Sequence, residues 1–146
     1  MKILIAEDSP EKLIQIEHLL VESIGVEKNK ITITKNKEET IDILENSIFD
    51  LIILDMSLPK YKSEDSNIIH LAGKEVLIFL KHQRKNIPTV VLTAHDVFGH
   101  HDAQISLNKL TLDLNKRFKK FLKGVYPWDA SSDEWKNLMK KTIEEL

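Results

Sequence analysis

The 146-residue chain contains no cysteine, which excludes disulfide bonds, thiolate metal sites and a cysteine nucleophile. It also lacks an apolar run long enough to span a membrane, and the four apolar residues after Met1 and Lys2 are too few for a signal peptide. Charge of neither sign dominates, because 21 Lys and Arg face 23 Asp and Glu. We therefore expect a cytoplasmic protein with no membrane span. The near balance of charge argues neither for nor against a nucleic-acid partner, which we do not expect.

The chain has no internal repeats or low-complexity tracts, and its 42% hydrophobic content can form one sizeable core. Strand and helix patterns alternate along it. Apolar or alternating runs predict strands at 2–6, 31–34, 51–54 and 89–93, and helical spacing of apolar residues predicts helices at 10–23, at 37–46 and from residue 71 onward. Such alternation predicts a parallel sheet covered by helices on both faces.

Acidic residues follow two of these predicted strands. Asp55 comes directly after the buried run Leu51-Ile52-Ile53-Leu54, and Glu7 and Asp8 follow the first strand. Open α/β sheets bind ligands at the carboxyl ends of their strands, so three carboxylates are expected to converge there. Like charges this close require a cation, and oxygen ligands suit Mg²⁺. The alternative is structural, since Asp8 or Ser9 could simply cap a helix starting at Pro10, and Asp55 could occupy a turn.

With Thr93-Ala94 after the fourth strand, these motifs make the chain similar to the receiver domains of two-component response regulators. The segment Asp55-Met56-Ser57-Leu58-Pro59 carries much of the likeness. The resemblance implies a flavodoxin-like, doubly wound, five-stranded parallel sheet of order 2-1-3-4-5 with helices on both faces. It also implies one domain over residues 1–146 with no output domain.

The resemblance further implies a phosphoacceptor that takes a phosphoryl group from a histidine kinase or phosphotransfer protein and acts through a downstream protein partner. Asp55 would be the phosphoacceptor, and the Thr93 hydroxyl, beside Ala94, would bind the phosphoryl group and move with it. Asp8 and Asp55 would bind Mg²⁺ directly, together with the backbone carbonyl of Ser57, and Glu7 would act directly or through a water molecule. Enzymatic activity is expected only as self-catalysed phosphorylation and dephosphorylation, and the oligomeric state, a homodimer included, stays open.

Two departures from the family pattern concern glycine and lysine. A glycine usually follows the phosphoacceptor closely, but here the nearest is Gly73, so residues 60–69 resemble an insertion that we expect to be mobile and able to cover the site. The family also has a Lys-Pro pair at the end of the fifth strand. The best match places Tyr126 before Pro127, at the lysine position, and leaves Lys123 as the candidate cation for the phosphoryl group.

The segment 109–123 holds six basic residues and one acid, Asp113. Its apolar residues recur at helical spacing, which predicts a helix longer than the family's fourth one that runs into a strand near residues 123–126. A basic amphipathic helix could meet an acidic partner, nucleic acid or a membrane surface, or it could be the solvated face of a core helix.

One further function remains as an alternative, and a second can be discounted. A degenerate receiver would act as an interaction module without phosphorylation, and the missing lysine favours this interpretation. A phosphatase of the haloacid dehalogenase type also uses an aspartate at a strand end. It needs a second aspartate two residues later, where this chain has Ser57, so we discount that function.

Overall fold

The computed structural model describes residues 1–59, 72–94, 97–98 and 105–146. Within these residues, five parallel strands form one sheet of order β2-β1-β3-β4-β7. The strands are β1 (Ile3–Ala6), β2 (Ile31–Thr34), β3 (Leu51–Leu54), β4 (Thr89–Thr93) and β7 (Leu122–Pro127). The predicted flavodoxin-like order 2-1-3-4-5 is confirmed, with β7 as the fifth strand.

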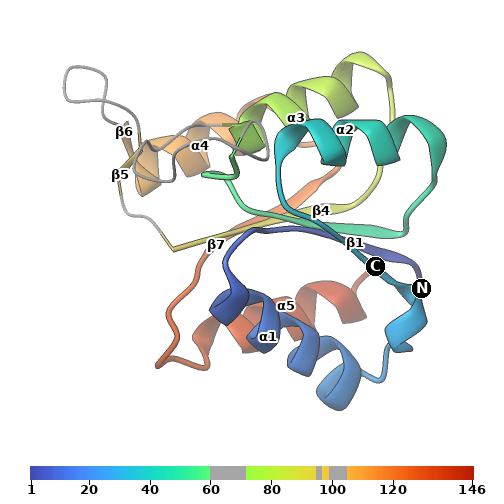
Figure 1. Cartoon of the computed structure of the whole chain (residues 1–146). Coiled ribbons are helices and arrows are strands. Elements are labelled where there is room, and N and C mark those ends of the chain that lie inside the picture. The colour runs from blue at the N-terminus through green and yellow to red at the C-terminus, as the bar shows by residue number, and fades with distance from the viewer. Residues whose placement is uncertain (60–71, 95–96, 99–104) are drawn as a thin grey trace.

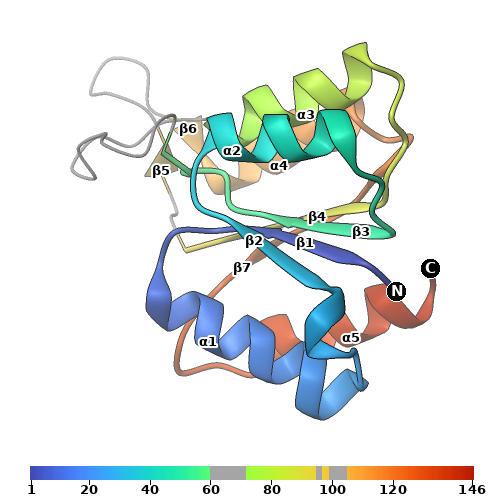
Figure 2. The ribbon, with the colours of Figure 1, turned by 45° about the vertical axis from the view of Figure 1, so that its right-hand side comes forward.

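Helices cover both faces of this sheet, as predicted (Figure 1). They are α1 (Pro10–His18), α2 (Lys37–Asn46), α3 (Ala72–His82), α4 (Leu107–Arg117) and α5 (Glu134–Glu144). Helices α1 and α5 lie on one face, and α2, α3 and α4 lie on the other (Figures 1 and 2). Both termini lie at the edge where β1 begins, so the carboxyl ends of the strands open at the opposite edge.

The core consists of two apolar layers because successive strand residues point to opposite faces. Leu4 and Leu54 pack with α2, α3 and α4, whereas Ile5 and Ile53 pack with α1 and α5. All four are essentially inaccessible to solvent. This explains why the central strands are apolar without interruption, as expected for strands that are covered on both sides.

The turn between β1 and α1 contains Glu7 and Asp8, two of the acids that the sequence predicts at the metal site. Ser9 caps α1, since its hydroxyl accepts the backbone N–H of Lys12 at 3.4 Å, and Pro10 occupies the first helical position. The helix therefore begins directly after Glu7 and Asp8. It continues as a π-helix, η1 (Leu19–Ile24), and ends at Gly25, whose φ of 88° lies in the left-handed region.

Two parts of the structure differ from the sequence-based expectation. The basic segment does not form one helix over 109–123, because α4 ends at Arg117 and the chain turns before β7. Phe118 and Phe121 keep helical spacing but lie buried in this turn, where they fill the core beside α4. A short antiparallel pair, β5 (Val97–Phe98) with β6 (Ile105–Ser106), was not predicted.

The predicted loop at 60–69 lies outside the described residues. Among the helices of the described ranges, none combines the length and the apolar character that crossing a membrane requires.

Candidate functional site

Three carboxylates meet at the carboxyl ends of β1 and β3. These neighbouring strands pair Ala6 with Leu54, so the residues that follow them emerge side by side. The Asp55 amide donates to the Ala6 carbonyl at 3.0 Å, which fixes the start of the second loop relative to the first strand. Carboxylate oxygens of Glu7, Asp8 and Asp55 all lie within 4.8 Å of one another. This all-oxygen set fits a hard divalent cation such as Mg²⁺.

Two of these acids are buried, which makes their charges costly without a cation. Glu7 is 3% exposed and Asp55 is 6% exposed. Burial, followed by the nearby charge of Asp55, raises the pKa of Glu7 from 4.5 to about 7 against the opposing effect of Lys12. One Glu7 oxygen accepts the backbone N–H of Ser9 at 3.1 Å. The site is therefore an anionic cluster that attracts positive charge.

A lysine that the sequence patterns did not single out lies inside this cluster. The Nζ atom of Lys12 is 2.6 Å from Glu7 Oε2 and 3.5 Å from Asp55 Oδ1, and it donates to the carbonyl of Leu92 in β4. Lys12 is only 2% exposed. The sequence could have pointed to Lys12, because the helix dipole disfavours a positive charge in the first turn of a helix. A lysine at that position therefore indicates a compensating interaction.

Ser57 also contacts the central acid. Its backbone N–H lies 3.4 Å from Asp55 Oδ1, and its hydroxyl lies 3.3 Å from Asp55 Oδ2. The loop after β3 therefore curls back over the carboxylate. Metal binding by the Ser57 backbone carbonyl stays a prediction.

Thr93 and Ala94 lie at the carboxyl end of β4, the strand next to β3. The Thr93 hydroxyl oxygen is buried and has no hydrogen-bond partner within the described part of the chain. A buried hydroxyl normally has a partner, so this atom has unused capacity to bind a ligand oxygen. Ala94 is exposed and lines a surface hollow together with Pro127 and Trp128.

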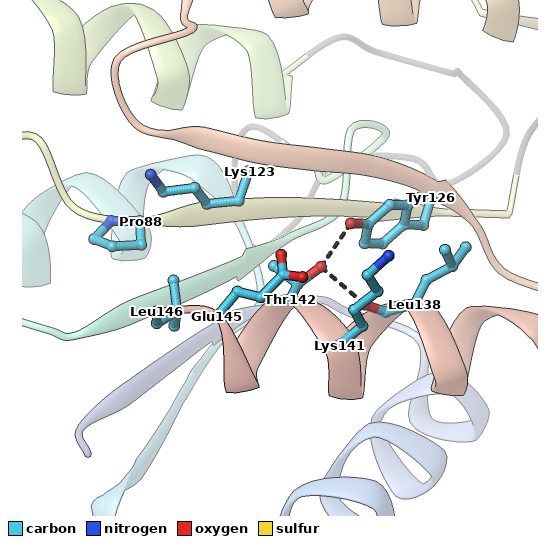
Figure 3. A pocket seen from close by; sticks show the side chains of 8 residues that line it. All are labelled: Pro88, Lys123, Tyr126, Leu138, Lys141, Thr142, Glu145 and Leu146. Carbon is cyan, nitrogen blue, oxygen red and sulfur yellow. Dashed lines mark hydrogen bonds between the residues drawn. The ribbon is translucent and has the colours of Figure 1, made fainter.

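Lys123 is not brought to the carboxylates. In the pairing of β4 with β7, Leu122 lies opposite Thr89 and Gly124 lies opposite Val90, so Lys123 is the extra residue of a bulge. This bulge is at the amino end of β4, whereas the acids lie at the carboxyl ends of the strands. Figure 3 shows Lys123 extending toward Pro88, beside a pocket between β7 and α5.

Tyr126, at the predicted lysine position, is also directed away from the acids. It lies opposite Leu92 in the sheet, and its hydroxyl is 2.6 Å from the Thr142 hydroxyl of α5 (Figure 3). The tyrosine packs with the apolar layer beneath α1 and α5. The carboxyl end of β7 therefore has a neutral hydrogen-bonded pair where the family has a lysine.

Gly73 closes the site from the side of α3. A Cβ atom built at this position would lie 2.5 Å from the Asp55 backbone oxygen and 2.7 Å from Met56 Cα, closer than packed atoms can be. The Gly73 N–H donates to the Met56 carbonyl at 3.1 Å. This glycine, although distant in sequence, packs directly against the backbone of the central acid.

Comparison with solved structures defines the class of fold. A signal receiver domain from Vibrio parahaemolyticus aligns with a TM-score of 0.63 at 22% identity, over 99% of this chain and 90% of that one. The Thermotoga maritima response regulator TrrA, solved in complex with Mg²⁺ and BeF, aligns with a TM-score of 0.58 at 19% identity, over 97% and 99% of the two chains. The fold is that of CheY-like receiver domains.

Sequence comparison places the chain within that class. No family model matches the sequence. The Detocs response regulatory protein DtcB of Enterobacter cloacae is 32% identical over 152 residues, which cover 100% of both proteins. The chain belongs to the response-regulator receiver family.

Proposed function

We propose that this chain is a phosphoacceptor switch that is phosphorylated on Asp55 in a Mg²⁺-dependent reaction. The observation that carries the proposal is the convergence of Glu7, Asp8 and Asp55 at one sheet edge, with carboxylate oxygens within 4.8 Å of one another. Neighbouring strands hold the three acids close enough to share one cation. Mg²⁺ held there would reduce the repulsion between the carboxylate nucleophile and an anionic phosphodonor.

The chemical step is a phosphoryl transfer to a carboxylate. An Asp55 oxygen forms a bond to the phosphorus of the donor, and the bond between phosphorus and the donor's leaving group breaks. With acetyl phosphate as donor, acetate leaves with the electron pair of that bond and Asp55 becomes an acyl phosphate. In the cell, the donor we propose is a histidine kinase or a phosphotransfer protein.

Thr93 connects the phosphoryl group to the rest of the molecule in this proposal. Its buried hydroxyl is available to donate to a phosphoryl oxygen, and the backbone N–H of Trp128 donates to its carbonyl at 2.8 Å. A shift of Thr93 would therefore displace the segment after β7 through this hydrogen bond. We propose that the output is a changed affinity for a protein partner.

The test is uptake of a phosphoryl group from acetyl phosphate with Mg²⁺, followed by intact-mass measurement. We expect one adduct in the parent protein, none in Asp55→Asn and none when EDTA removes the metal. Asp50→Asn is the matched control, because Asp50 is an exposed acid just before β3, at the opposite edge of the sheet. An adduct that persists in Asp55→Asn contradicts the assignment.

A second candidate function is a receiver that acts as an interaction module without phosphorylation. The observation that favours it is the loss of the strand-end lysine, since Tyr126 is bonded to Thr142 instead. The same experiment separates the two functions. A parent protein that forms no adduct under any donor condition, and yet retains Mg²⁺ binding, would favour the interaction module.

A further inference from the structure

Lys12 is held where an ordinary structural lysine is not expected. It occupies the first turn of α1, where the helix dipole disfavours a cation, and it is almost completely buried. Three separate strand ends contact its ammonium group, through Glu7 after β1, Asp55 after β3 and the Leu92 carbonyl in β4. A side chain that normally reaches solvent therefore lies at the centre of the acidic site.

The family's own position for a cation carries no charge in this chain. Tyr126 occupies it and is directed to α5, and Lys123 lies at the other edge of the sheet (Figure 3). Within the described ranges, Lys12 is the one basic residue that forms an ion pair with Asp55. The positive charge at this site therefore comes from α1.

We propose that Lys12 is the residue that contacts the phosphoryl group on Asp55, so that this role has moved from the end of the fifth strand to the first turn of α1. The inference rests on the proposed phosphorylation of Asp55. An ammonium group has three N–H donors. The bond to the Leu92 carbonyl fixes the position of the ammonium, and the donor facing Asp55 is placed to bind an oxygen of a group attached to that carboxylate.

The neighbourhood of Thr93 strengthens this assignment. Thr93 directly follows Leu92, the residue whose carbonyl anchors Lys12, and its hydroxyl is buried without a partner among the described residues. The two side chains thus supply a charged and a neutral donor beside one strand end. A hydrogen bond from a charged donor is stronger than one from a neutral donor. Replacing Lys12 should therefore destabilise the phosphorylated state more than the unphosphorylated state.

A purely structural role for Lys12 makes a different prediction. If the lysine serves only to neutralise Glu7, its removal changes the stability of the fold but leaves the affinity for a phosphoryl analogue intact. Beryllofluoride provides such an analogue, because it mimics a phosphoryl group on a carboxylate. Its affinity at saturating Mg²⁺ therefore separates the two roles.

The experiment compares Lys12→Met with Lys123→Met, a lysine removed from the strand that carries the family's cation. Beryllofluoride binding is followed by tryptophan fluorescence, since the backbone N–H of Trp128 donates to the carbonyl of Thr93, and phosphorylation by acetyl phosphate is followed by intact mass. We expect Lys12→Met to weaken beryllofluoride binding and slow phosphorylation by about 10- to 100-fold, the range of a hydrogen bond to a charged group. Lys123→Met should match the parent protein.

Two measurements guard against misfolding. Mg²⁺ affinity without beryllofluoride should be retained in Lys12→Met, because the three carboxylates remain, and Lys12→Arg should recover part of the lost beryllofluoride affinity. If Lys12→Met does not fold, Lys12→Gln serves in its place, since it keeps a polar N–H donor without the charge.

The outcomes are distinct. A phosphorylated parent protein with an unaffected, folded Lys12→Met overturns the assignment of Lys12 and leaves the proposed function standing. A parent protein that takes up no phosphoryl group overturns the proposed function, and the assignment with it. Parent-like Lys123→Met with impaired Lys12→Met supports the relocation.

Discussion

The ends of β1 and β3 differ sharply from the end of β7, although all three strands open at the same edge of the sheet. Beyond β1 and β3 lie buried charges, Glu7 and Asp55 with Lys12 between them. At β7 lies a neutral pair, Tyr126 and Thr142. The difference shows that one sheet edge collects side chains from several strand ends and helix starts. A required charge can therefore be supplied by whichever element reaches the site.

The comparison also separates two kinds of stabilisation. At the first region the raised pKa of Glu7 makes stability depend on pH and on bound cations, whereas the region at β7 is held by an uncharged hydrogen bond. We therefore expect substitutions in the two regions to differ in the size of their effect on the free energy of unfolding and in how that effect depends on pH.

The largest expected effect is the pH dependence of stability that Glu7 causes in metal-free protein. Its pKa is raised from 4.5 to about 7 on folding, chiefly by burial. Between these values the folded chain retains a proton that the unfolded chain has lost, so the free energy of unfolding falls as the pH rises through this window. Each pH unit between the two pKa values corresponds to about 1.4 kcal/mol, so the total decrease is about 3 kcal/mol, and it levels off above pH 7.

Urea unfolding at pH 4.5, 6 and 8 measures this decrease, and Glu7→Gln should flatten the profile. Glu45→Gln, an exposed acid on α2, is the matched control and should keep the parent profile. Saturating Mg²⁺ should also reduce the slope, because a bound cation favours the ionised carboxylate. A parent profile that rises from pH 4.5 to 8 would show that other groups dominate.

The next effect in size concerns the contact of α3 with the acidic site. Gly73→Ala places a Cβ atom 2.5 Å from the Asp55 backbone oxygen, so the helix or the loop must move. Overpacking of this kind costs about 2 kcal/mol, and we expect the displaced Asp55 to be phosphorylated more slowly. Thermal unfolding and the rate of acetyl phosphate labelling measure the two consequences.

Gly25→Ala is the control for Gly73→Ala, because it should destabilise the fold through backbone strain without displacing Asp55. Gly25 has a φ of 88° and no atom within 4 Å of a built Cβ, so its replacement should cost about 1 kcal/mol through backbone strain. The labelling rate should then stay at the parent value. Equal labelling rates in both variants would show that Gly73 does not position Asp55.

The sequence predicted the central sheet well because its signals are local. Runs such as Leu51-Ile52-Ile53-Leu54 are apolar at every position, as strands covered on both faces require, and they match the observed strands. The acidic cluster was predictable for the same reason, since Glu7 and Asp55 directly follow such runs. The helix expected over 109–123 was wrong in extent, because the aromatic residues after Arg117 keep helical spacing while filling a turn.

The source of positive charge could not be inferred from local patterns. Lys123 looked suitable because it precedes Pro127 on one strand, but a bulge and its place at the amino end of the sheet direct it elsewhere. Lys12 looked like a surface residue of a helix. Its burial depends on the packing of α1 beneath three strand ends, a relation between distant segments that spacing along one helix does not contain.

The smallest expected effect belongs to the neutral region at β7. The Thr142 hydroxyl donates its one proton to the Leu138 carbonyl at 2.8 Å, so Tyr126 is the donor in the 2.6 Å contact with Thr142. Tyr126→Phe removes that donor and should lower the free energy of unfolding by about 1 kcal/mol, equally at pH 5 and pH 8. In a double-mutant cycle with Thr142→Val, the two losses should not add, since both remove the same bond. The labelling rate should stay within about twofold of the parent, because Tyr126 does not contact the acids and the barrier to phosphoryl transfer should change little. A loss of labelling of tenfold or more in Tyr126→Phe would instead couple the end of β7 to Asp55, and the separation between the charged and the neutral strand ends would fail.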